Sequence, residues 1–415
     1  MLKAMSRTSV DLKTIEVISS LLQIVNTKKA TCNDKVAELE KAYARYIGTK
    51  NAVAFPYSRT GTYYALKALG LEEGDEVILP AFTFWVDAAM VVMAGLKPVF
   101  VDVQFDTQSI DHRKITKAIT ARTKVIYPTH LNGLPADMDP IMKIAKKHNL
   151  RVVEDCARSC GATYKGKRIG SFDIGSFSFG YGKSFYGFGG AMVTSDDDGF
   201  ISKLRDLKSD FSHISTKELC IQTIKGSLLK YLNLPYLYRF SLYPLVYQFQ
   251  VKGKEEYAGR FRVKMPSYDS VPDSFKVDMN NVQARLGLSQ LKRIDSTNRK
   301  RMENAEILSD QLSNIPGLHI PRDFTDRENV SVHYAIWTER SKELQRFLTI
   351  HKIDAQDETA IDTTTLERFK PYAKGKYPNA QKLHNKLIFL PTHISLGKKD
   401  MLYIAGKVKE FFGVK

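Results

Sequence analysis

The chain has 415 residues, 43% of them apolar and 26% charged, a composition that excludes a fibrous, collagen-like or wholly disordered protein. Lysine and arginine number 62 against 45 aspartates and glutamates, so the formal net charge is +17. This excess favours anionic partners, such as phosphorylated small molecules, nucleic acid or an acidic membrane surface, and the length predicts about two or three domains.

From the N-terminus to about residue 200 the sequence alternates between helical and strand patterns. Residues 1–50 read as helical. Strands are then expected at 75–80, 97–103, 124–130 and 151–156, and helices at 82–95, 115–123 and 135–149. This rhythm predicts an α/β fold, in which a mostly parallel sheet has helices on both faces. Ligands of such sheets bind at the carboxyl ends of the strands, so segments 55–60 and 80–84, His130 and Asp155 are expected at one rim.

The second half of the chain has a different pattern. An aromatic and basic insertion is expected near 211–270, where Pro235 and Pro244 exclude one continuous helix. A long connecting helix is expected over 277–312, and a smaller C-terminal α+β domain over 313–415, with strands at 333–338 and 386–391. The predicted organisation is therefore a large domain over 1–275, a connecting segment over 276–312, and the small domain.

The cysteines and the apolar runs indicate the compartment. Cys32, Cys156, Cys160 and Cys220 are too sparse for a disulfide framework, and none has the spacing of zinc ligands. The N-terminus lacks the apolar core of a signal peptide, and no run of about 18 apolar residues is long enough to span a membrane. The sequence therefore predicts a cytoplasmic protein without a metal site.

Two clusters at the predicted rim could bind charged groups. The tetrapeptide SRTG (58–61) lies between a strand and a helix, where its hydroxyl and backbone N–H groups could bind an anion or simply cap the helix. Asp155 ends the apolar strand VVED, where its carboxylate could hold a cationic group, cap a helix or form a salt bridge. Neither cluster decides the chemistry alone.

A lysine in an unusual setting forms the third cluster. Lys183 lies in a glycine- and aromatic-rich loop between the strand-like runs SFSF and GAMVT. Partial burial would lower the pKa of its amine and make it a nucleophile, whereas an ordinary loop lysine would be solvated. An anion site, a carboxylate and an amine at one rim together fit pyridoxal phosphate. The lysine would form the Schiff base and the carboxylate would keep the pyridine nitrogen protonated.

The order and spacing of these clusters resemble the DegT/DnrJ/StrS-type sugar aminotransferases, which are fold-type-I pyridoxal-phosphate enzymes. The resemblance covers most of residues 35–200, resumes at 280–295 and returns more weakly at 376–396. It rests on SRTGTYYALKALGLEEGDEVILPAFTF, GLKPVFVDV, HLNGLPADMDPIMKIAKKH, VVEDCARSCGATYKGKRIGSFDIGSFSF, FGGAMVTSDD, NNVQARLGLSQLKRID and KYPNAQKLHNKLIFLPTHISL.

The resemblance implies a role for each of several residues. Lys183 would be the Schiff-base lysine, and Asp155 would pair with the pyridine nitrogen. The other implied cofactor-binding residues are Phe84 over the ring, Arg158 near the phenolic oxygen, and Ser58, Arg59, Thr60 and Ser178 around the phosphate. The family implies pyridoxal 5'-phosphate as cofactor and a homodimer with shared active sites. It also implies transfer of an amino group from glutamate to a keto-sugar linked to a nucleotide.

Four features depart from the family pattern. Arg158 replaces a glutamine or histidine, and Asp278 replaces an asparagine that reaches the partner's site. The segment before LERFKPYAKGKYP lacks the usual Tyr-Pro and His elements, and the insertion near 211–270 is longer than the family norm. The sequence therefore indicates the chemistry more firmly than the substrate.

Alternative functions stay open at this point. The protein could use the same cofactor on a non-sugar carbonyl compound, or dehydrate a sugar, although relatives that dehydrate carry histidine in place of Lys183. An inactive protein could instead bind an anionic surface through the insertion, either the inner face of a membrane or single-stranded nucleic acid. We do not expect nucleic acid as a partner. The insertion is interpreted first as a dimer interface or a lid, with peripheral membrane contact as the alternative.

Overall fold

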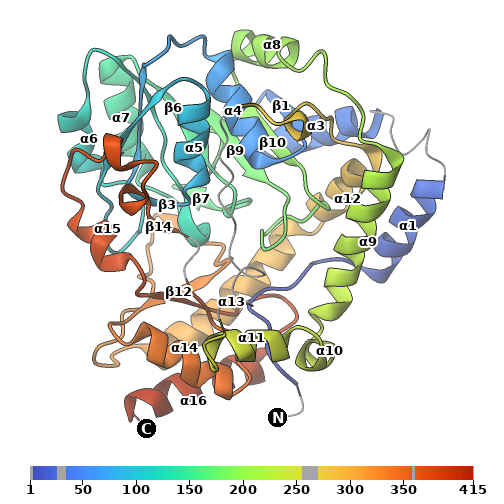
Figure 1. Cartoon of the computed structure of the whole chain (residues 1–415), viewed down its shortest axis with the longest axis vertical. Helices are drawn as coiled ribbons and strands as arrows, with labels where there is room; N and C mark the ends of the chain where they lie inside the picture. Colours follow the sequence, from blue (N-terminus) through green and yellow to red (C-terminus); the bar gives the residue numbers. More distant parts are fainter. Residues whose placement is uncertain (1–2, 26–33, 255–269, 358–359, 415) are drawn as a thin grey trace.

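The computed structural model in Figure 1 describes residues 3–25, 34–254, 270–357 and 360–414. Its large domain is built on a seven-stranded sheet with the order β1-β10-β9-β6-β5-β2-β4. Only β10 runs against the other strands, so the expectation of a mostly parallel sheet is confirmed. The strands are β1 (Asn51–Phe55), β2 (Glu76–Pro80), β4 (Lys97–Val101), β5 (Thr123–Ile126), β6 (Arg151–Asp155), β9 (Ile174–Ser178) and β10 (Ala191–Ser195).

Helices cover both faces of this sheet because its strands are apolar on both sides. Val53 and Phe55 of β1 pack into one cluster with α4 (Ser58–Ala68), α5 (Val86–Met93) and α8 (Asp198–Asp206). The alternate residues Ala52 and Ala54 pack into a second cluster. That cluster includes α3 (Asp34–Ile47), α6 (His112–Ala118) and α7 (Met138–His148). Successive side chains of a strand point to opposite faces, so one strand contributes to both cores.

The C-terminal domain is a small α+β unit below the sheet domain (Figure 1). Its antiparallel sheet has the order β12-β15-β13, with β12 at Tyr334–Trp337, β15 at Leu387–Leu390 and β13 at Gln356–Asp357. An apolar core joins this sheet to α13 (Ile294–Leu312), α14 (Ser341–Ile350) and α16 (Lys398–Phe412). The strands expected at 333–338 and 386–391 are therefore present, each trimmed at its ends.

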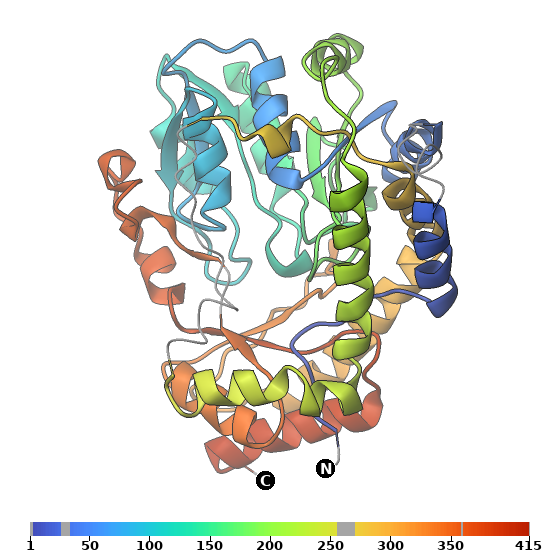
Figure 2. The ribbon, with the colours of Figure 1, turned by 45° about the vertical axis from the view of Figure 1, so that its right-hand side comes forward.

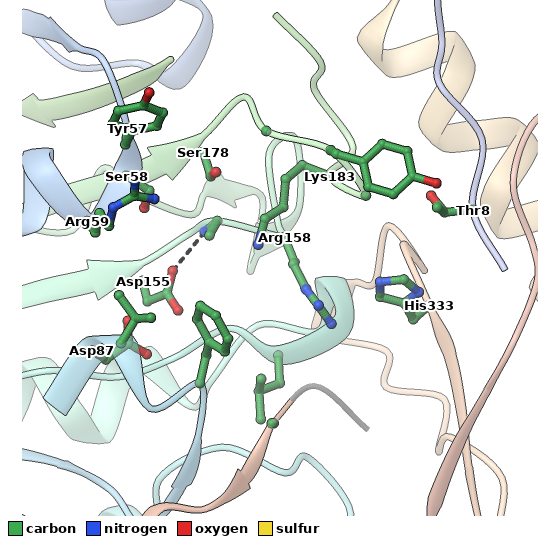
Figure 3. A pocket seen from close by; sticks show the side chains of 18 of the residues that line it. Thr8, Tyr57, Ser58, Arg59, Asp87, Asp155, Arg158, Ser178, Lys183 and His333 are labelled. Carbon is green, nitrogen blue, oxygen red and sulfur yellow. Dashed lines mark hydrogen bonds between the residues drawn. The ribbon is translucent and has the colours of Figure 1, made fainter. Parts of the chain in front are cut away.

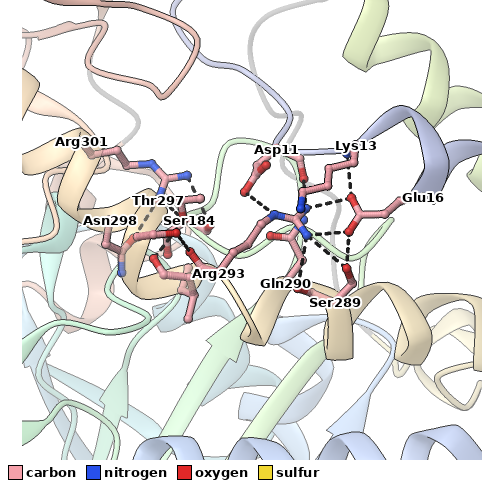
Figure 4. Close-up of polar contacts among 12 residues, drawn as sticks. Asp11, Lys13, Glu16, Ser184, Ser289, Gln290, Arg293, Thr297, Asn298 and Arg301 are labelled. Carbon is pink, nitrogen blue, oxygen red and sulfur yellow. Dashed lines mark hydrogen bonds and ion pairs between the residues drawn. The ribbon is translucent and has the colours of Figure 1, made fainter.

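The single helix expected over 277–312 is wrong, because the structure has two helices there. The first, α12 (Asn281–Leu291), begins at a capping box between Asn280 and Gln283, and α13 follows after a break. Arg293 at the break has φ −133° and ψ 0°. Figure 4 shows its guanidinium turned to the N-terminal segment, where it pairs with Glu16 at 2.6 Å and with Asp11 at 3.3 Å. These ion pairs join segments far apart in sequence. The pattern of apolar residues within 277–312 therefore could not indicate that the helix breaks at Arg293.

The helical reading of residues 1–50 is only partly right. The helices α1 (Thr14–Val25) and α3 are present, but residues 4–8 form no helix. Met5 forms a parallel bridge with Ile353 of the C-terminal domain, and the N–H of Ala4 donates to the carbonyl of Pro235. The helix expected at 115–123 lies earlier, at α6, because Asp111 caps it by accepting from the N–H of Arg113.

The insertion forms three helices where it is described: α9 (Thr216–Leu232), α10 (Pro235–Phe240) and α11 (Tyr243–Gln250). Pro235 and Pro244 lie in the first turns of α10 and α11, which confirms that they exclude one continuous helix. Residues 255–269 of the insertion lie outside the described residues. Figure 2 shows α9 upright beside the sheet domain and reaching down to the C-terminal domain, with α10 and α11 lying across that domain.

An exposed apolar face accompanies the insertion. Eleven of the 16 strongly exposed large apolar side chains among the described residues lie on or next to α1, α9 and α10. They are Ile15, Ile18, Leu21, Leu22, Ile221, Ile224, Leu228, Leu234, Tyr236, Leu237 and Phe240. We call this set the α1–α9–α10 face. Within the described ranges, no helix is both long enough and apolar enough to cross a bilayer.

Candidate active site

A cavity of about 510 Å³ lies at the carboxyl ends of the sheet strands. Seven of the eight predicted site residues line it: Ser58, Arg59, Phe84, Asp155, Arg158, Ser178 and Lys183. Thr60 is fully buried and does not line the cavity, whereas Thr62, two residues further along the helix, does. Figure 3 shows Ser58, Arg59 and Ser178 together, with Asp155 below them and Lys183 reaching in from the opposite loop. The structure thus brings the three predicted clusters to one place.

Lys183 carries the reactive amine of this cavity. Burial, followed by the like charge of Arg158, lowers the pKa of its ammonium group from 10.5 to about 8, against the opposing effects of Asp155 and Asp87. The side chain is surrounded by protein, yet it faces the cavity and is still reached by solvent. At pH 7 roughly a tenth of Lys183 is therefore an uncharged amine, far more than for an ordinary lysine, as a nucleophile or general base requires.

The loop that carries Lys183 is fixed from both sides. Phe185 packs against Phe179 with ring centroids 4.4 Å apart, in a buried aromatic cluster that also contains Tyr43. Behind the loop, Arg301 of α13 donates to the carbonyl of Ser184 at 3.4 Å (Figure 4). The residue after the lysine is therefore tied to the connecting helix, which sets the direction in which the amine points.

Asp155 ends β6 and faces the cavity. Its Oδ1 accepts a hydrogen bond from the N–H of Ala157 at 2.9 Å, and the residue is 8% exposed. Of the three roles open from sequence, the position favours the binding of a cationic group, because the carboxylate lines the cavity beside Arg158 and Lys183. It is not a helix N-cap, since Asp155 is followed by turns and by short strand segments.

A second carboxyl group, Asp87 on α5, was not predicted. It lines the cavity, accepts from the hydroxyl of Thr83 at 2.8 Å and accepts from the hydroxyl of Tyr127 at 3.4 Å. Burial and the neighbouring Asp155 raise the pKa of its carboxyl group well above the usual value. The signal in the sequence was its isolation, because Asp87 is the only charged residue in the helix VDAAMVVM.

The N-terminus of α4 offers unsatisfied donors. Tyr57 occupies the N-cap position without a side-chain cap hydrogen bond, so the capping interpretation of SRTG does not hold. Two buried polar atoms in the first turn, Arg59 Nε and Thr60 Oγ1, have no hydrogen-bond partner. Buried polar groups normally have partners, and helix N-termini attract anions. Together with Ser58 and Ser178, this turn fits a phosphate group.

Pyridoxal phosphate therefore fits the residues present. The first turn of α4 would supply donors for the phosphate, Asp155 would supply a carboxylate for the ring nitrogen, and Lys183 would supply an amine with a lowered pKa. Phe84 lines the cavity as an aromatic surface for the ring. A cavity of about 510 Å³ is within the range that binds small organic ligands.

The side of the cavity beyond Arg158 was missed from the sequence. It is formed by Arg7, Thr8, Asn233, Tyr238, Leu242, His333 and Asp354. Figure 3 shows Thr8 and His333 on this side of the cavity, away from Ser58 and Arg59. These residues come from the N-terminal segment, the insertion and the C-terminal domain. No local motif links segments so far apart, so the sequence carried no signal for this wall.

His130 has a structural role as well as a place in the cavity wall. Its Nδ1 accepts from the N–H of Ala136 at 3.0 Å, so Nε2 carries the proton and donates to Glu154 at 3.1 Å. Glu154 also accepts from the N–H groups of Gly170 and Phe172 at 2.9 Å each. His130, Glu154 and Cys156 are close enough to hold a metal ion, but these hydrogen bonds account for the group.

The two departures from the family pattern have different surroundings. Arg158 lines the cavity and contacts Asn132 at 3.4 Å. Burial lowers the pKa of its guanidinium to about 10, so it is charged at neutral pH. Asp278 does not line this cavity and pairs with Lys208 at 2.9 Å. Its negative charge is therefore balanced within its own chain.

Comparison with known proteins agrees with this geometry. The family model described as the DegT/DnrJ/EryC1/StrS aminotransferase family matches residues 13–230 and 240–409. The spore coat polysaccharide biosynthesis protein SpsC of Bacillus subtilis is 29% identical over 396 residues, which cover 93% of this chain and 92% of SpsC. GDP-perosamine synthase of Caulobacter vibrioides is 44% identical over 174 residues, 42% of this chain and 47% of that protein. The crystal structure of S. venezuelae DesV, a complex with a ketimine intermediate, is similar with a TM-score of 0.76 and 25% identity, covering 96% and 94% of the two chains.

Proposed function

Because the chain belongs to the DegT/DnrJ/EryC1/StrS aminotransferase family, we propose that it is a pyridoxal-phosphate enzyme that moves an amino group from glutamate to a nucleotide-linked keto-sugar. One observation carries the proposal. Lys183, with its lowered pKa, shares a single cavity with Asp155 and with Arg59 at the start of α4, whose Nε has no hydrogen-bond partner. The names of the relatives, which include a polysaccharide biosynthesis protein and a GDP-perosamine synthase, support a sugar as the acceptor.

Each binding residue has a defined task in this proposal. Bound pyridoxal phosphate supplies an electron sink for the carbon that loses its proton. Asp155 would hold the protonated ring nitrogen, and Ser58, Arg59 and Ser178 would hold the phosphate. Phe84 would cover one face of the ring. Arg158 would lie beside the reacting end with its positive charge, close enough to Lys183 to lower the pKa of the lysine.

Lys183 would move the proton. The lowered pKa makes its uncharged Nζ far more abundant at neutral pH than that of an ordinary lysine, so it can accept a proton from the α-carbon of the amino donor. In the opposite half of the cycle the same Nζ would return a proton to the carbon that was the carbonyl of the acceptor. The contacts that fix the loop hold Nζ in one position for both transfers.

The cationic side of the cavity suits an acceptor that carries phosphate. The formal charge of +17 attracts anions to the whole molecule, and Arg158 places positive charge in the cavity besides Arg59, which is assigned to the cofactor phosphate. A nucleotide-linked sugar brings two phosphates with negative charge. The presence of lysine rather than histidine at position 183 favours amino transfer over dehydration of the sugar.

Absorption spectroscopy tests the proposed chemistry directly. The purified protein should bind pyridoxal phosphate with a visible absorption band, and glutamate should remove that band. Lys183→Ala should lose the band, whereas the control Lys165→Ala should keep it, because Lys165 is an exposed loop lysine beside Gly166 and outside the cavity. A wild-type protein that binds no pyridoxal phosphate, or whose band ignores every amino donor, would contradict the proposal.

The proposal includes a homodimer. The α1–α9–α10 face carries eleven exposed large apolar side chains in the single chain, and a concentration of such side chains supports an interaction site there. A second copy of the chain would cover it, as the family resemblance implies. Light scattering should give twice the mass of the 47.0 kDa chain, and Ile224→Glu with Leu228→Glu should reduce it. A monomer that sediments with phosphatidylglycerol vesicles would instead assign the face to a membrane surface.

A further inference from the structure

Two segments far apart in the sequence meet at the outer wall of the cavity. Arg7 and Thr8 come from the extended N-terminal segment, and Asn233, Tyr238 and Leu242 come from the end of α9 and the region of α10. The family model match begins at residue 13 and leaves out residues 231–239. Most of this wall therefore belongs to parts of the chain that the family pattern does not cover.

The wall is held firmly in place. The N–H of Met5 donates to the carbonyl of Lys352 at 2.9 Å, and the N–H of Asp354 donates to the carbonyl of Met5 at 2.9 Å. On the other side, the N–H of Ala4 donates to the carbonyl of Pro235 at 3.0 Å. The N-terminal segment is thus clamped between the insertion and the C-terminal domain. Its next residues, Arg7 and Thr8, have little freedom to leave the cavity.

The charges in this wall cancel one another. Arg7 forms two hydrogen bonds with Asp354, at 2.8 and 2.7 Å, and Asp354 is fully buried. The hydroxyl of Tyr238 donates to the same carboxylate. A paired guanidinium and carboxylate leave no net charge for a phosphate or carboxylate ligand. The anion-binding part of the cavity is therefore at the opposite end, around Ser58 and Arg59.

Neutral hydrogen-bonding groups remain on this side. His333 is 5% exposed, lines the cavity and has no hydrogen-bond partner at Nε2. Burial, with Arg158 and Lys183 nearby, lowers the pKa of His333 well below its usual value, so the imidazole is neutral. The amide of Asn233 accepts from Tyr181 at 3.3 Å and donates to the carbonyl of Leu229 at 2.7 Å, which leaves one amide hydrogen for a ligand.

We propose that Thr8 and Asn233 bind the hydroxyl groups of the acceptor's sugar ring. The N-terminal segment and the insertion form this neutral subsite at the end of the cavity opposite Ser58 and Arg59. Uncharged donors and acceptors around a rigid wall suit an uncharged polyhydroxylated ring and discriminate against acceptors that lack hydroxyl groups. Tyr238 is a positioning residue, because its hydroxyl is used on Asp354. This inference rests on the proposed function and names which residues select the acceptor.

The two halves of the amino-transfer cycle allow a direct test. Thr8→Val and Asn233→Ala are compared with Thr14→Val and Ser241→Ala, which lie in the same two segments but do not line the cavity. In the first half, glutamate removes the visible band of each loaded protein. In the second half, the band is restored by dTDP-linked or GDP-linked 4-keto-6-deoxyhexose. Each loss of a hydroxyl contact should raise the half-saturating concentration of keto-sugar by roughly three- to tenfold, while the rate with glutamate stays within about twofold.

The outcomes separate this inference from the proposed function. Equal losses in both halves, or none in the second half, would overturn the subsite. A wild-type protein that reacts with glutamate but with neither keto-sugar would also overturn it, while leaving amino transfer in place. A wild-type protein that does not respond to glutamate would instead contradict the proposed function. Thermal melting and the intensity of the visible band confirm that each variant folds and loads cofactor.

Discussion

The guanidinium of Arg158 and the amine of Lys183 share one cavity as two like charges. Burial is the main reason that the pKa of Lys183 falls to about 8, and repulsion from Arg158 adds to it. Because only the uncharged amine attacks a carbonyl, the rate at which the protein takes up pyridoxal phosphate should rise with pH and level off above about 8. Stopped-flow absorbance across pH 6–10 measures this rate.

Replacing Arg158 should move that pH profile. Arg158→Gln removes the repulsion, so the lysine holds its proton more tightly and the midpoint should rise by up to about one pH unit. The uptake rate at neutral pH should fall accordingly, while the limiting rate at high pH is kept. The control is Arg168→Gln, since Arg168 pairs with Asp295 outside the cavity. An unchanged midpoint in Arg158→Gln would show that burial alone sets the pKa.

The buried carboxyl of Asp87 should make the protein less stable as pH rises. Its pKa is raised in the folded state, so between its unfolded pKa of about 3.9 and its folded pKa the folded chain binds the proton more tightly. In that window its contribution to the free energy of unfolding falls by about 1.4 kcal/mol per pH unit. Asp87→Asn, which cannot ionise, should flatten the curve and raise the melting temperature at pH 7. A variant that melts lower than wild type at pH 7 would contradict this account.

Gly226 should allow α9 to pack closely against Tyr186 and Phe188 in the loop after Lys183. A Cβ atom at this position would lie 2.3 Å from a ring carbon of Phe188 and 2.5 Å from the hydroxyl of Tyr186. Gly226→Ala should therefore lower stability by about 1–3 kcal/mol despite the better helix propensity of alanine. The matched control is Gly406→Ala in α16, where the space is open and alanine should stabilise by about 1 kcal/mol or less. Denaturant unfolding of both variants measures the difference.

The hydrogen bond from Arg301 to the carbonyl of Ser184 should strengthen cofactor binding, because it holds the loop that carries Lys183. Arg301→Lys keeps a positive charge but cannot hold both Asn298 and Ser184 in the same geometry. We expect the dissociation constant of pyridoxal phosphate to rise roughly three- to tenfold, as for the loss of one hydrogen bond. Arg299→Lys, an exposed position on the same helix, should change nothing. Equilibrium dialysis of the two variants would show equal affinities if the contact had no such role.

The parts of the fold that could be predicted are those set by local pattern. The strands at 75–80 and 151–156 were placed within about one residue, because apolar runs between turn residues are read directly. Asp155 and Lys183 could be assigned for the same reason, since strand ends and glycine-rich loops carry local signals. The helix break at Arg293 could not, because it depends on ion pairs with residues about 280 positions away.

The missed site residues depend on contacts between distant segments. Asp87 left a trace as a lone acid in an apolar helix, but its proximity to Asp155 follows only from the packing of α5 on the sheet. No sequence pattern marks Thr8 or Asn233 as a cavity residue, because each lines the cavity only where the first residues of the chain lie between the insertion and the C-terminal domain. Sequence patterns indicate the secondary structure of a segment, and less often its tertiary contacts.

The clamp around residues 4–8 has a consequence for altering substrate choice. The N-terminal segment hydrogen-bonds to Pro235 of the insertion and to Lys352 of the C-terminal domain. Exchanging any one of these three pieces therefore breaks hydrogen bonds that hold the segment in place. Grafting the insertion alone into a relative would leave the carbonyl of Pro235 without the N–H of Ala4 and the hydroxyl of Tyr238 without Asp354, and grafting the first eight residues alone would leave Arg7 without Asp354. A chimera that transfers acceptor preference must carry all three pieces together.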